Sequence, residues 1–157
     1  MSLPPFQAVL DAHRGDLYRF LVASVGASDA DDCFQETVIA ALRAYPRLSH
    51  GGNLRAWFLR IAQRKAIDSH RARGRRPMPV ETVPETPVSS APAVLDGEPD
   101  LWPSVRDLPP KQRTAVFCRS VLGMPYPELA ELLECSEDAA RRSVHEGLKR
   151  LREEWVR

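Results

Sequence analysis

The sequence contains no apolar stretch that approaches the roughly 18 to 20 residues needed for a membrane-spanning helix. Its first residues, MSLPPFQAVLDAHRGD, carry acids and prolines in place of the basic region and apolar core of a secretory signal. We therefore expect a cytoplasmic protein with no membrane insertion.

Cysteine is scarce as well, with three residues in 157: Cys33, Cys118 and Cys135. They lie far apart, and no CxxC pair or His/Cys cluster of zinc-ligand spacing accompanies them. We interpret them as small buried hydrophobic residues, not as disulfide partners or metal ligands. GxSxG, P-loop and HExxH motifs are also missing, and Ser69 and His70 are sequence neighbours without an orienting partner. The sequence therefore indicates a protein that is not an enzyme and needs no cofactor.

Residues 77–100, PMPVETVPETPVSSAPAVLDGEPD, lack Lys and Arg altogether and contain six prolines and five acids. Proline cannot continue a helix, and this composition is not expected to pack a core. We interpret the segment as a semi-stiff linker between an N-terminal domain, residues 1–76, and a C-terminal domain, residues 101–157. Its acids are either simply solvated or shield a basic face until a partner displaces them.

Helical periodicity runs through the N-terminal domain. The first predicted helix stops near Gly26, and its inward stripe is Phe6, Val9, Leu10, His13, Leu17, Phe20 and Leu21. A second helix is expected to begin at a Ser28 or Asp29 cap and to end at Pro46. Its buried side is predicted to be Phe34, Val38, Ala41, Leu42 and Tyr45. The opposite side carries acids and an amide, and the helix dipole explains Asp31 and Asp32 better than Gln35 and Glu36.

The third predicted helix is strongly basic. Residues 54–76 hold eight Arg or Lys and a single acid, Asp68. Asn53 is expected to cap the helix, with Leu54, Trp57, Phe58, Ile61 and Ala62 facing inward. The outward or edge positions are Arg55, Arg60, Gln63, Arg64 and Arg71. Such a face is either a solvated surface or a nucleic-acid site, and its charge density beside aromatic residues favours phosphate binding next to a base-stacking pocket.

The C-terminal domain contains a more specific pattern. LPPKQRTAVFCRSVLG predicts a helix that begins at Pro109 or Pro110 and stops at Gly123. YPELAELLECSEDAARRSVHEGLKRLREEW then predicts a short helix, a turn at Glu134 and Cys135, and a longer helix capped by Ser136. This is typical of a helix-turn-helix, whose second helix enters the major groove of DNA. A helical hairpin with a charged exterior is the alternative.

On the second helix of this pattern, the candidates for DNA contact are Glu137, Asp138, Arg141, Arg142, His145 and Lys149. Glu128 and Glu131 on the first are expected to be solvated. Together the patterns predict an all-α protein of two small helical domains.

Three motifs, in order, resemble the extracytoplasmic-function, or group 4, sigma factors of bacterial RNA polymerase. DADDCFQETVIAALRAY resembles the helix that binds core polymerase, and NLRAWFLRIAQRKAIDSHRAR resembles the helix that recognises and melts the minus-ten element. LPPKQRTAVFCRSVLGMPYPELAELLECSEDAARRSVHEGLKRLRE resembles the fourth conserved region, which reads the minus-thirty-five element.

The resemblance implies residue roles. Asp32, Gln35 and Glu36 would contact the clamp helices of the largest polymerase subunit. The minus-ten element would be bound by Ser49, His50, Asn53, Arg55, Trp57, Arg60, Arg64 and Arg71, with the loop LSHGGN receiving an extruded base. The minus-thirty-five element would be bound by Ser136, Glu137, Asp138, Arg141, Arg142, His145 and Lys149. Ser143 and Glu146 stand where the family frequently has arginine, so the DNA sequence read is expected to be unusual.

The family is typically held inactive by an anti-sigma factor, so the resemblance implies such a partner besides core RNA polymerase and promoter DNA. A transcription regulator that binds DNA without polymerase would explain the helix-turn-helix but not the N-terminal domain. A protein-interaction adaptor that binds only a regulator would need no basic faces.

Overall fold

The computed structural model describes residues 3–48, 52–75 and 102–155. Regular structure in these residues is entirely helical: α1 (Phe6–Val25), α2 (Ala27–Ala44), the 3-10 helix η1 (Tyr45–Arg47), α3 (Leu54–Arg75), α4 (Trp102–Asp107), α5 (Pro110–Ser120), α6 (Tyr126–Leu133) and α7 (Glu137–Trp155). The predicted all-α class is confirmed. None of these helices is both long enough and apolar enough to span a membrane. The predicted linker lies outside the described residues, so its boundaries stay a prediction.

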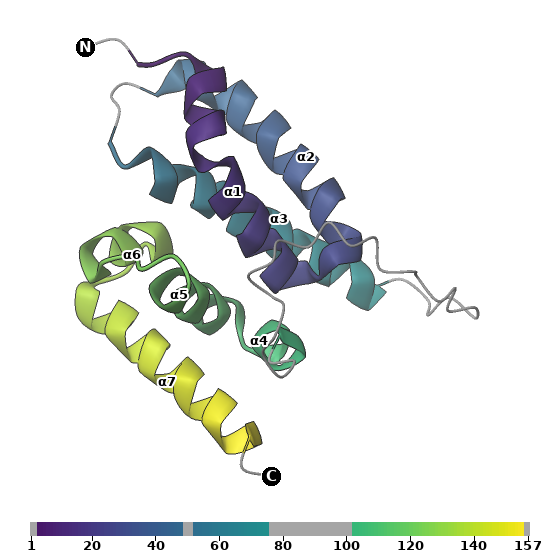
Figure 1. The fold of residues 1–157 in the computed structure, drawn as a ribbon, viewed down its shortest axis with the longest axis vertical. Helices are drawn as coiled ribbons and strands as arrows, with labels where there is room; N and C mark the ends of the chain where they lie inside the picture. Colours follow the sequence, from purple (N-terminus) through teal and green to yellow (C-terminus); the bar gives the residue numbers. More distant parts are fainter. Residues whose placement is uncertain (1–2, 49–51, 76–101, 156–157) are drawn as a thin grey trace.

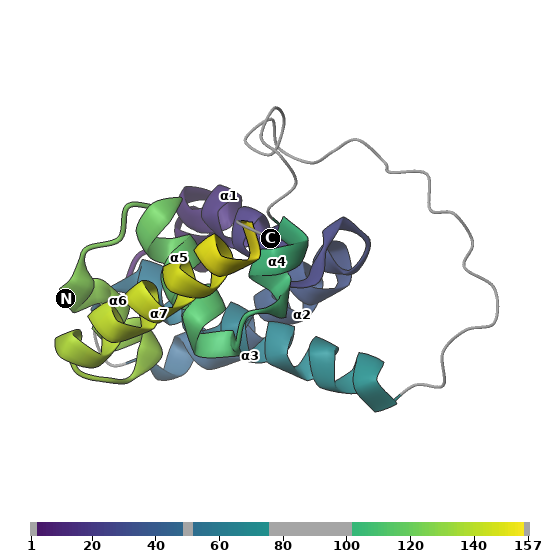
Figure 2. The same cartoon turned by 90° about the horizontal axis from the view of Figure 1, so that it is seen from below.

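Helices α1, α2 and α3 pack together as one group, and α4 to α7 form a second group beside it (Figure 1). Seen from below, α7 lies along α5, and the last turns of α3 extend beyond the other helices (Figure 2). The predicted inward stripe of α1 is largely buried, with Leu17, Phe20 and Leu21 fully covered. At its end Gly26 takes a φ of 87°, a left-handed conformation that suits glycine, and the chain turns directly into α2.

The start and the orientation of α2 both differ from the prediction. Gly26, not Ser28 or Asp29, occupies the N-cap position, because the turn at this glycine lets the helix restart at Ala27. The buried side is formed by Ala30, Cys33, Thr37 and Ala41. These small residues allow α2 to lie close to α1 and α3, and the helix is rotated so that Leu42 points outward, 54% exposed. The prediction that Leu42 is buried was wrong.

Helix α3 begins as expected. The Oδ1 atom of Asn53 accepts a hydrogen bond from the backbone N–H of Ala56 at 3.0 Å, which satisfies a donor that the first helical turn leaves free. Phe58, Leu59 and Ala62 are fully buried against α1 and α2 or against the C-terminal helices.

The C-terminal helices follow the predicted helix-turn-helix. Glu134 ends α6 in the left-handed conformation, with φ 55° and ψ 47°, and the N–H of Cys135 bonds to the carbonyl of Ala130 at 3.0 Å. The Oγ atom of Ser136 then accepts from the N–H of Ala139 at 3.1 Å and caps α7. Helix α4 was not predicted, and its Trp102 ring packs against Phe117 with centroids 6.1 Å apart.

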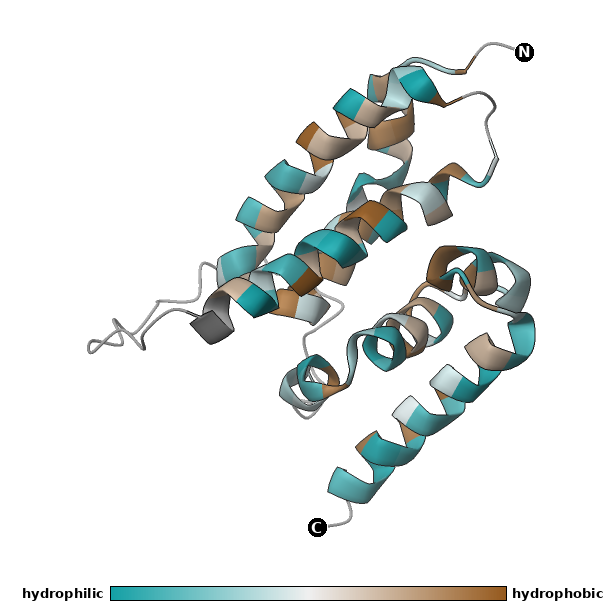
Figure 3. Ribbon diagram, turned by 180° about the vertical axis from the view of Figure 1, so that it is seen from behind, coloured by the Kyte–Doolittle hydropathy of each residue, from teal (hydrophilic) through white to brown (hydrophobic). Residues whose placement is uncertain are grey.

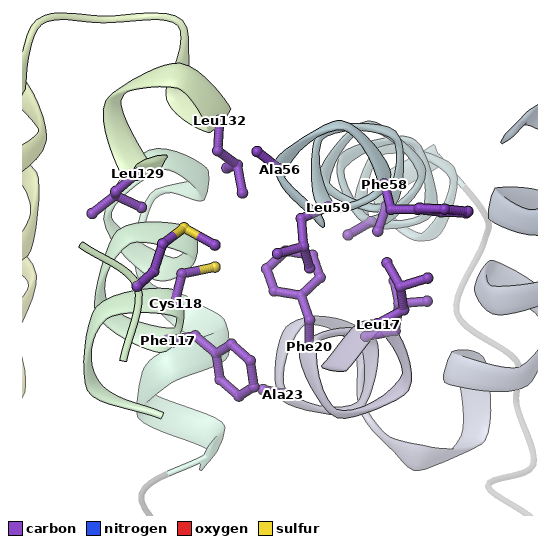
Figure 4. Packing of buried hydrophobic residues seen from close by; sticks show 14 of the residues in the cluster. Leu17, Phe20, Ala23, Ala56, Phe58, Leu59, Phe117, Cys118, Leu129 and Leu132 are labelled. Atoms are coloured by element: carbon purple, nitrogen blue, oxygen red, sulfur yellow. The ribbon is translucent and has the colours of Figure 1, made fainter. Parts of the chain in front are cut away.

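One apolar core joins the two groups of helices. The Phe20 ring of α1 meets the Phe117 ring of α5 edge to face, with centroids 5.8 Å apart. Figure 4 shows Leu59 and Ala56 of α3 facing Leu132 of α6 across the same contact. Because each group is small, this shared burial gives both more apolar cover than either has alone.

Candidate nucleic-acid interface

The outer face of α2 exposes a continuous row of side chains. Asp32, Gln35 and Glu36 are exposed, and Ile39 and Leu42 extend the row one and two turns further, 50% and 54% exposed. Those two are the exposed large hydrophobic side chains in the part of the chain that the structure describes. We call these five residues the α2 row.

Further acids lie beside the first half of the α2 row. Asp29 and Asp68 line a cleft between α2 and α3 together with Asp32 and Glu36. This part of the surface is negative, so it repels DNA phosphates and suits a basic protein surface. That Asp32, Gln35 and Glu36 contact polymerase stays a prediction.

The predicted DNA-binding arginines of α3 lie elsewhere, opposite α6. Arg55 forms a two-pronged contact with Glu128: its Nε donates to Oε1 at 2.7 Å and its Nη2 to Oε2 at 3.0 Å. A second carboxylate, that of Asp16 on α1, lies 3.7 Å from Nη1. The side chains of Arg55 and Glu128 are 25% and 12% exposed. The hydrogen bonds from Arg55 hold the pKa of Glu128 below its ordinary value, although partial burial opposes this shift.

Arg60 and Arg64 meet the other end of α6. The Nη2 of Arg60 donates to the backbone carbonyl of Glu131 at 2.6 Å, and its Nε lies 3.4 Å from the carboxylate of Glu134. The same carboxylate lies 3.5 Å from Nη2 of Arg64. We call Arg55, Arg60 and Arg64 the arginine row. All three face acceptors of α6, so the prediction of a basic face turned outward or along the helix edges is only partly right.

The prediction that Glu128 is solvated was wrong. It was made from the polar side of one short helix, and the partner of Glu128 lies 73 residues away in the sequence. Glu131 is exposed as predicted, and its carbonyl, not its side chain, contacts Arg60.

The other residues predicted to bind the minus-ten element are spread along α3 and the segment before it. Arg71 is exposed, and Trp57 is half-buried, its ring 5.0 Å from Phe58 and 6.1 Å from Tyr45. Asn53 uses its side-chain oxygen to cap α3. Ser49 and His50 lie outside the described residues.

The second helix of the helix-turn-helix presents an outward polar face, and α7 is mostly hydrophilic along its length (Figure 3). Its predicted contact residues are all exposed: Ser136, Glu137, Asp138, Arg141, Arg142, His145 and Lys149. Its inner side is anchored by Ala140 and Val144, which are buried against α5 and α6. Six of these side chains therefore lie on α7, and Ser136 lies at its N-cap.

Sequence reasoning missed Tyr126, the first residue of α6. The guanidinium carbon of Arg141 lies 4.8 Å from the centre of the Tyr126 ring, and that of Arg119 lies 4.2 Å from it. Arg119 also donates to the carbonyl of Met124 at 3.0 Å. The ring thus contacts arginines from α5 and α7 and limits the freedom of Arg141. No local pattern identifies this stack, because its members come from three helices.

Comparison with known proteins agrees with this geometry. Residues 9–76 match the family model of sigma-70 region 2, and residues 104–151 match that of sigma-70 region 4. The chain belongs to the sigma-70 family. This sigma factor is 34% identical over 160 residues to the ECF RNA polymerase sigma factor SigD of Mycobacterium tuberculosis, and the alignment covers 94% of this chain and 76% of that protein. It is 26% identical over 158 residues to the ECF RNA polymerase sigma factor SigX of Bacillus subtilis, covering 94% and 81% of the two chains.

Solved structures share the fold of this sigma factor. The sigma factor RpoE in complex with the anti-sigma factor NepR from Bartonella quintana aligns with a TM-score of 0.72 at 23% identity, over 94% of both chains. CnrH in complex with the cytosolic domain of CnrY aligns with a TM-score of 0.69 at 20% identity, over 96% of this chain and 87% of that one. These likenesses extend to both groups of helices.

Proposed function

We propose that this sigma factor binds core RNA polymerase through the α2 row, binds the minus-ten element through α3 and reads the minus-thirty-five element through α7. Promoter recognition and DNA melting follow from those contacts, and RNA synthesis is carried out by the polymerase. The observation that carries the proposal is the α2 row, because a DNA-binding regulator without polymerase has no use for it.

The α2 row has the mixed chemistry of a protein-binding surface. Exposed Ile39 and Leu42 lose water when a partner covers them, while Asp32, Gln35 and Glu36 offer acceptors to basic or polar groups of that partner. The residues lie on one helical face that α1 and α3 do not cover. A rigid helix with charge at one end and apolar area at the other fixes the register of docking.

For the minus-ten element, the arginine row supplies phosphate ligands and Trp57 supplies a stacking surface. Arginine binds phosphate with two parallel hydrogen bonds, and an unstacked base finds favourable contact on an aromatic ring. Ser49 and His50 of the preceding loop are proposed to receive the extruded base. In the arrangement described here the arginine row is engaged by α6, so α6 must move away before DNA binds.

For the minus-thirty-five element, the N-terminal half of α7 carries the reading residues. Arg141 and Arg142 offer donors to guanine, while Glu137 and Asp138 accept from cytosine. Glu146 accepts weakly from Gln112 of α5, at 3.4 Å, so its carboxylate is drawn toward the protein. This leaves the reading surface less negative than the sequence of α7 suggests.

An anti-sigma factor is also proposed as a partner. Support comes from the fold alone, because the two solved structures described above are complexes with an anti-sigma factor and with the cytosolic domain of CnrY. Such a protein would hold the sigma factor away from polymerase.

The test is run-off transcription with purified core RNA polymerase on a pool of genomic promoter fragments. We expect discrete start sites that depend on this protein. Glu36→Lys is expected to abolish them by placing a cation in the α2 row, since the side chain is exposed and its replacement leaves the core intact. Glu153→Lys makes the same change of charge at an exposed position near the end of α7 and is expected to transcribe normally.

Two results would contradict the proposal. DNA binding without any start sites would favour a regulator that works without polymerase. Equal activity of Glu36→Lys and the wild-type protein would remove the α2 row from polymerase binding.

A further inference from the structure

Aromatic rings join the starts of α1 and α3 to the 3-10 helix η1. The Phe6 ring lies edge to face against Tyr45, with centroids 5.4 Å apart, and 5.8 Å from Phe58. Tyr45 lies 6.1 Å from Trp57, whose ring meets Phe58 edge to face at 5.0 Å. Rings at these separations attract one another beyond the effect of the area that they bury. We call Phe6, Tyr45, Trp57 and Phe58 the aromatic cluster.

Tyr45 also forms a directional bond outside the aromatic cluster. Its hydroxyl donates a hydrogen bond to the backbone carbonyl of Pro4, 41 residues earlier in the chain. The residue is 9% exposed, so its ring is held between the N-terminal segment and Trp57. Through Tyr45, the segment before α1 is therefore connected to the first turn of α3.

Trp57 is half-buried, so part of its side chain stays open to solvent. The terminal torsion of a tryptophan side chain has broad minima, so the neighbours of the ring, more than its rotamer preference, fix its plane. Tyr45 and Phe58 are aromatic neighbours that restrict it. A ring that is already oriented avoids the entropy loss that a mobile side chain suffers when a ligand packs on it.

We propose that Tyr45 is a positioning residue for promoter melting, which orients the Trp57 ring for an unstacked base through its contacts with Pro4 and Phe6. This inference rests on the proposed stacking role of Trp57. Melting of paired DNA has to offset the cost of unstacking a base, whereas DNA that is already open does not. A poorly oriented ring therefore slows the melting of paired DNA most.

The hydroxyl of Tyr45 separates this role from simple core packing. Burial of the ring needs only its apolar surface, which phenylalanine supplies equally, and only the hydroxyl reaches Pro4. Because Pro4 is exposed, water can bond to its carbonyl when the hydroxyl is removed. Tyr45→Phe therefore removes the bond and keeps the packed core, and the melting temperature is expected to fall by less than about 4 °C.

The first measurement tests the orientation of the ring directly and needs no polymerase. The motion of Trp57 is measured by time-resolved fluorescence anisotropy in the full chain with Trp102→Phe and Trp155→Phe, which leave Trp57 as the single tryptophan. We expect Tyr45→Phe to increase the amplitude of the nanosecond motion of this ring about twofold.

The matched control is Tyr18→Phe. It removes a hydroxyl that donates to Oδ1 of Asp31 at 2.9 Å, in the same group of helices but outside the aromatic cluster. The control is expected to leave the motion of Trp57 unchanged.

The second measurement is transcription by core RNA polymerase with each variant, from a promoter that the run-off experiment identifies. One template is fully paired, and the other has non-complementary strands in the minus-ten element. Tyr45→Phe is expected to slow the first transcripts about three- to tenfold on the paired template, the range that loss of one hydrogen bond produces. On the open template its rate should stay within about twofold of wild type, because the unstacking cost is absent there. Tyr18→Phe should keep the wild-type ratio between the two templates.

Unchanged motion of Trp57 in Tyr45→Phe would overturn the inference whatever the transcription result. An equal loss on both templates would also overturn it, because it would indicate a general structural defect. Trp57→Ala distinguishes the two remaining errors. If it slows the paired template and Tyr45→Phe does not, Tyr45 is not a positioning residue and the stacking role of Trp57 stands. If Trp57→Ala is normal on both templates, the stacking role of Trp57 itself is wrong.

Discussion

At Gly147 helix α7 lies very close to α5, and replacing this glycine by alanine should disturb the packing of the two helices. A Cβ atom at this position would lie 2.5 Å from Cγ2 of Val116, and 3.4 Å from both Cβ and the backbone oxygen of Gln112. Val116 sits in a helix, where a β-branched side chain has one strongly preferred rotamer and cannot turn aside. The two helices must therefore separate by about 1 Å or the valine must leave its rotamer.

The expected change in the free energy of unfolding is the difference between two opposed effects. Overpacking of this kind costs about 1 to 3 kcal/mol, while Gly→Ala in a helix gains about 1 kcal/mol from propensity. We expect Gly147→Ala to lower the free energy of unfolding by about 1 kcal/mol, or the melting temperature by about 2 to 4 °C for a chain of this size. Urea and thermal unfolding followed by circular dichroism measure both quantities.

Gly15 provides the matched control, because it lies in α1 with nothing within 4 Å of an added Cβ. Gly15→Ala is expected to stabilise the protein by about 0.5 to 1 kcal/mol. The double variant Gly147→Ala with Val116→Ala should lose about 1 kcal/mol less unfolding free energy than the two single variants lose together. In the double variant the clash between the new methyl group and Val116 is absent. If Gly147→Ala stabilised the protein as much as Gly15→Ala does, the close contact between α5 and α7 would be refuted.

Acidification is expected to open the contact between Glu128 and Arg55, because the pKa of Glu128 is lowered in the folded state. The contact stabilises the fold fully above about pH 4.3, the ordinary pKa of a glutamate, and this stabilisation is lost as pH falls through the lowered pKa. A Glu128→Gln variant should lack this part of the acid transition, as monitored by scattering. Tyr126→Leu should weaken minus-thirty-five binding about two- to fivefold by freeing Arg141, with unchanged helix content; an unchanged affinity would show that the stack does not position the arginine. Thiol reagents should label Cys135 first, with two further thiols reacting after denaturation, as counted by mass spectrometry.

Local signals predicted most of the helices and several of their ends. Asn53 and Ser136 cap α3 and α7 as expected, because a capping side chain bonds to an N–H only a few residues away. Gly123, with a φ of 64°, ends the segment after α5, and the turn at Glu134 lies where the pattern placed it. Cys33 and Cys118 are buried as predicted, and burial raises the pKa of both thiols. Cys135 was also predicted to be buried but is only half-buried, because it lies in the turn between α6 and α7. Each of the correctly predicted features depends on residues nearby in the sequence or on the apolar character of a single side chain.

The errors arose where a helix face had to be chosen without its neighbours. The stripe that includes Leu42 has larger apolar side chains than the true buried side of α2, whose small residues let α1 and α3 approach. Spacing alone could have shown that Ile39 continues the row of Asp32 and Glu36, because positions three and four apart share a face. Helix α4 has six residues, too few for a periodic signal.

The counter-ions of the arginines of α3 could not be predicted for the same reason, because they lie far away in the sequence. The excess of arginine in residues 54–76 suggests that the acidic segment directly after it supplies the balancing charge. The described counter-ions of Arg55 and Arg60 are instead Asp16 of α1, Glu128 of α6 and Glu134, which ends α6. Without counter-ions, the arginine row would oppose the apolar contact between the two groups of helices. The free-energy cost of burying an unpaired charge is larger than the stabilisation from a ring contact such as that of Phe20 with Phe117. Carboxylates at both ends of α6 remove that opposition. Helix α6 therefore packs against α7 and also supplies counter-ions to α3, which explains why its polar side is acidic.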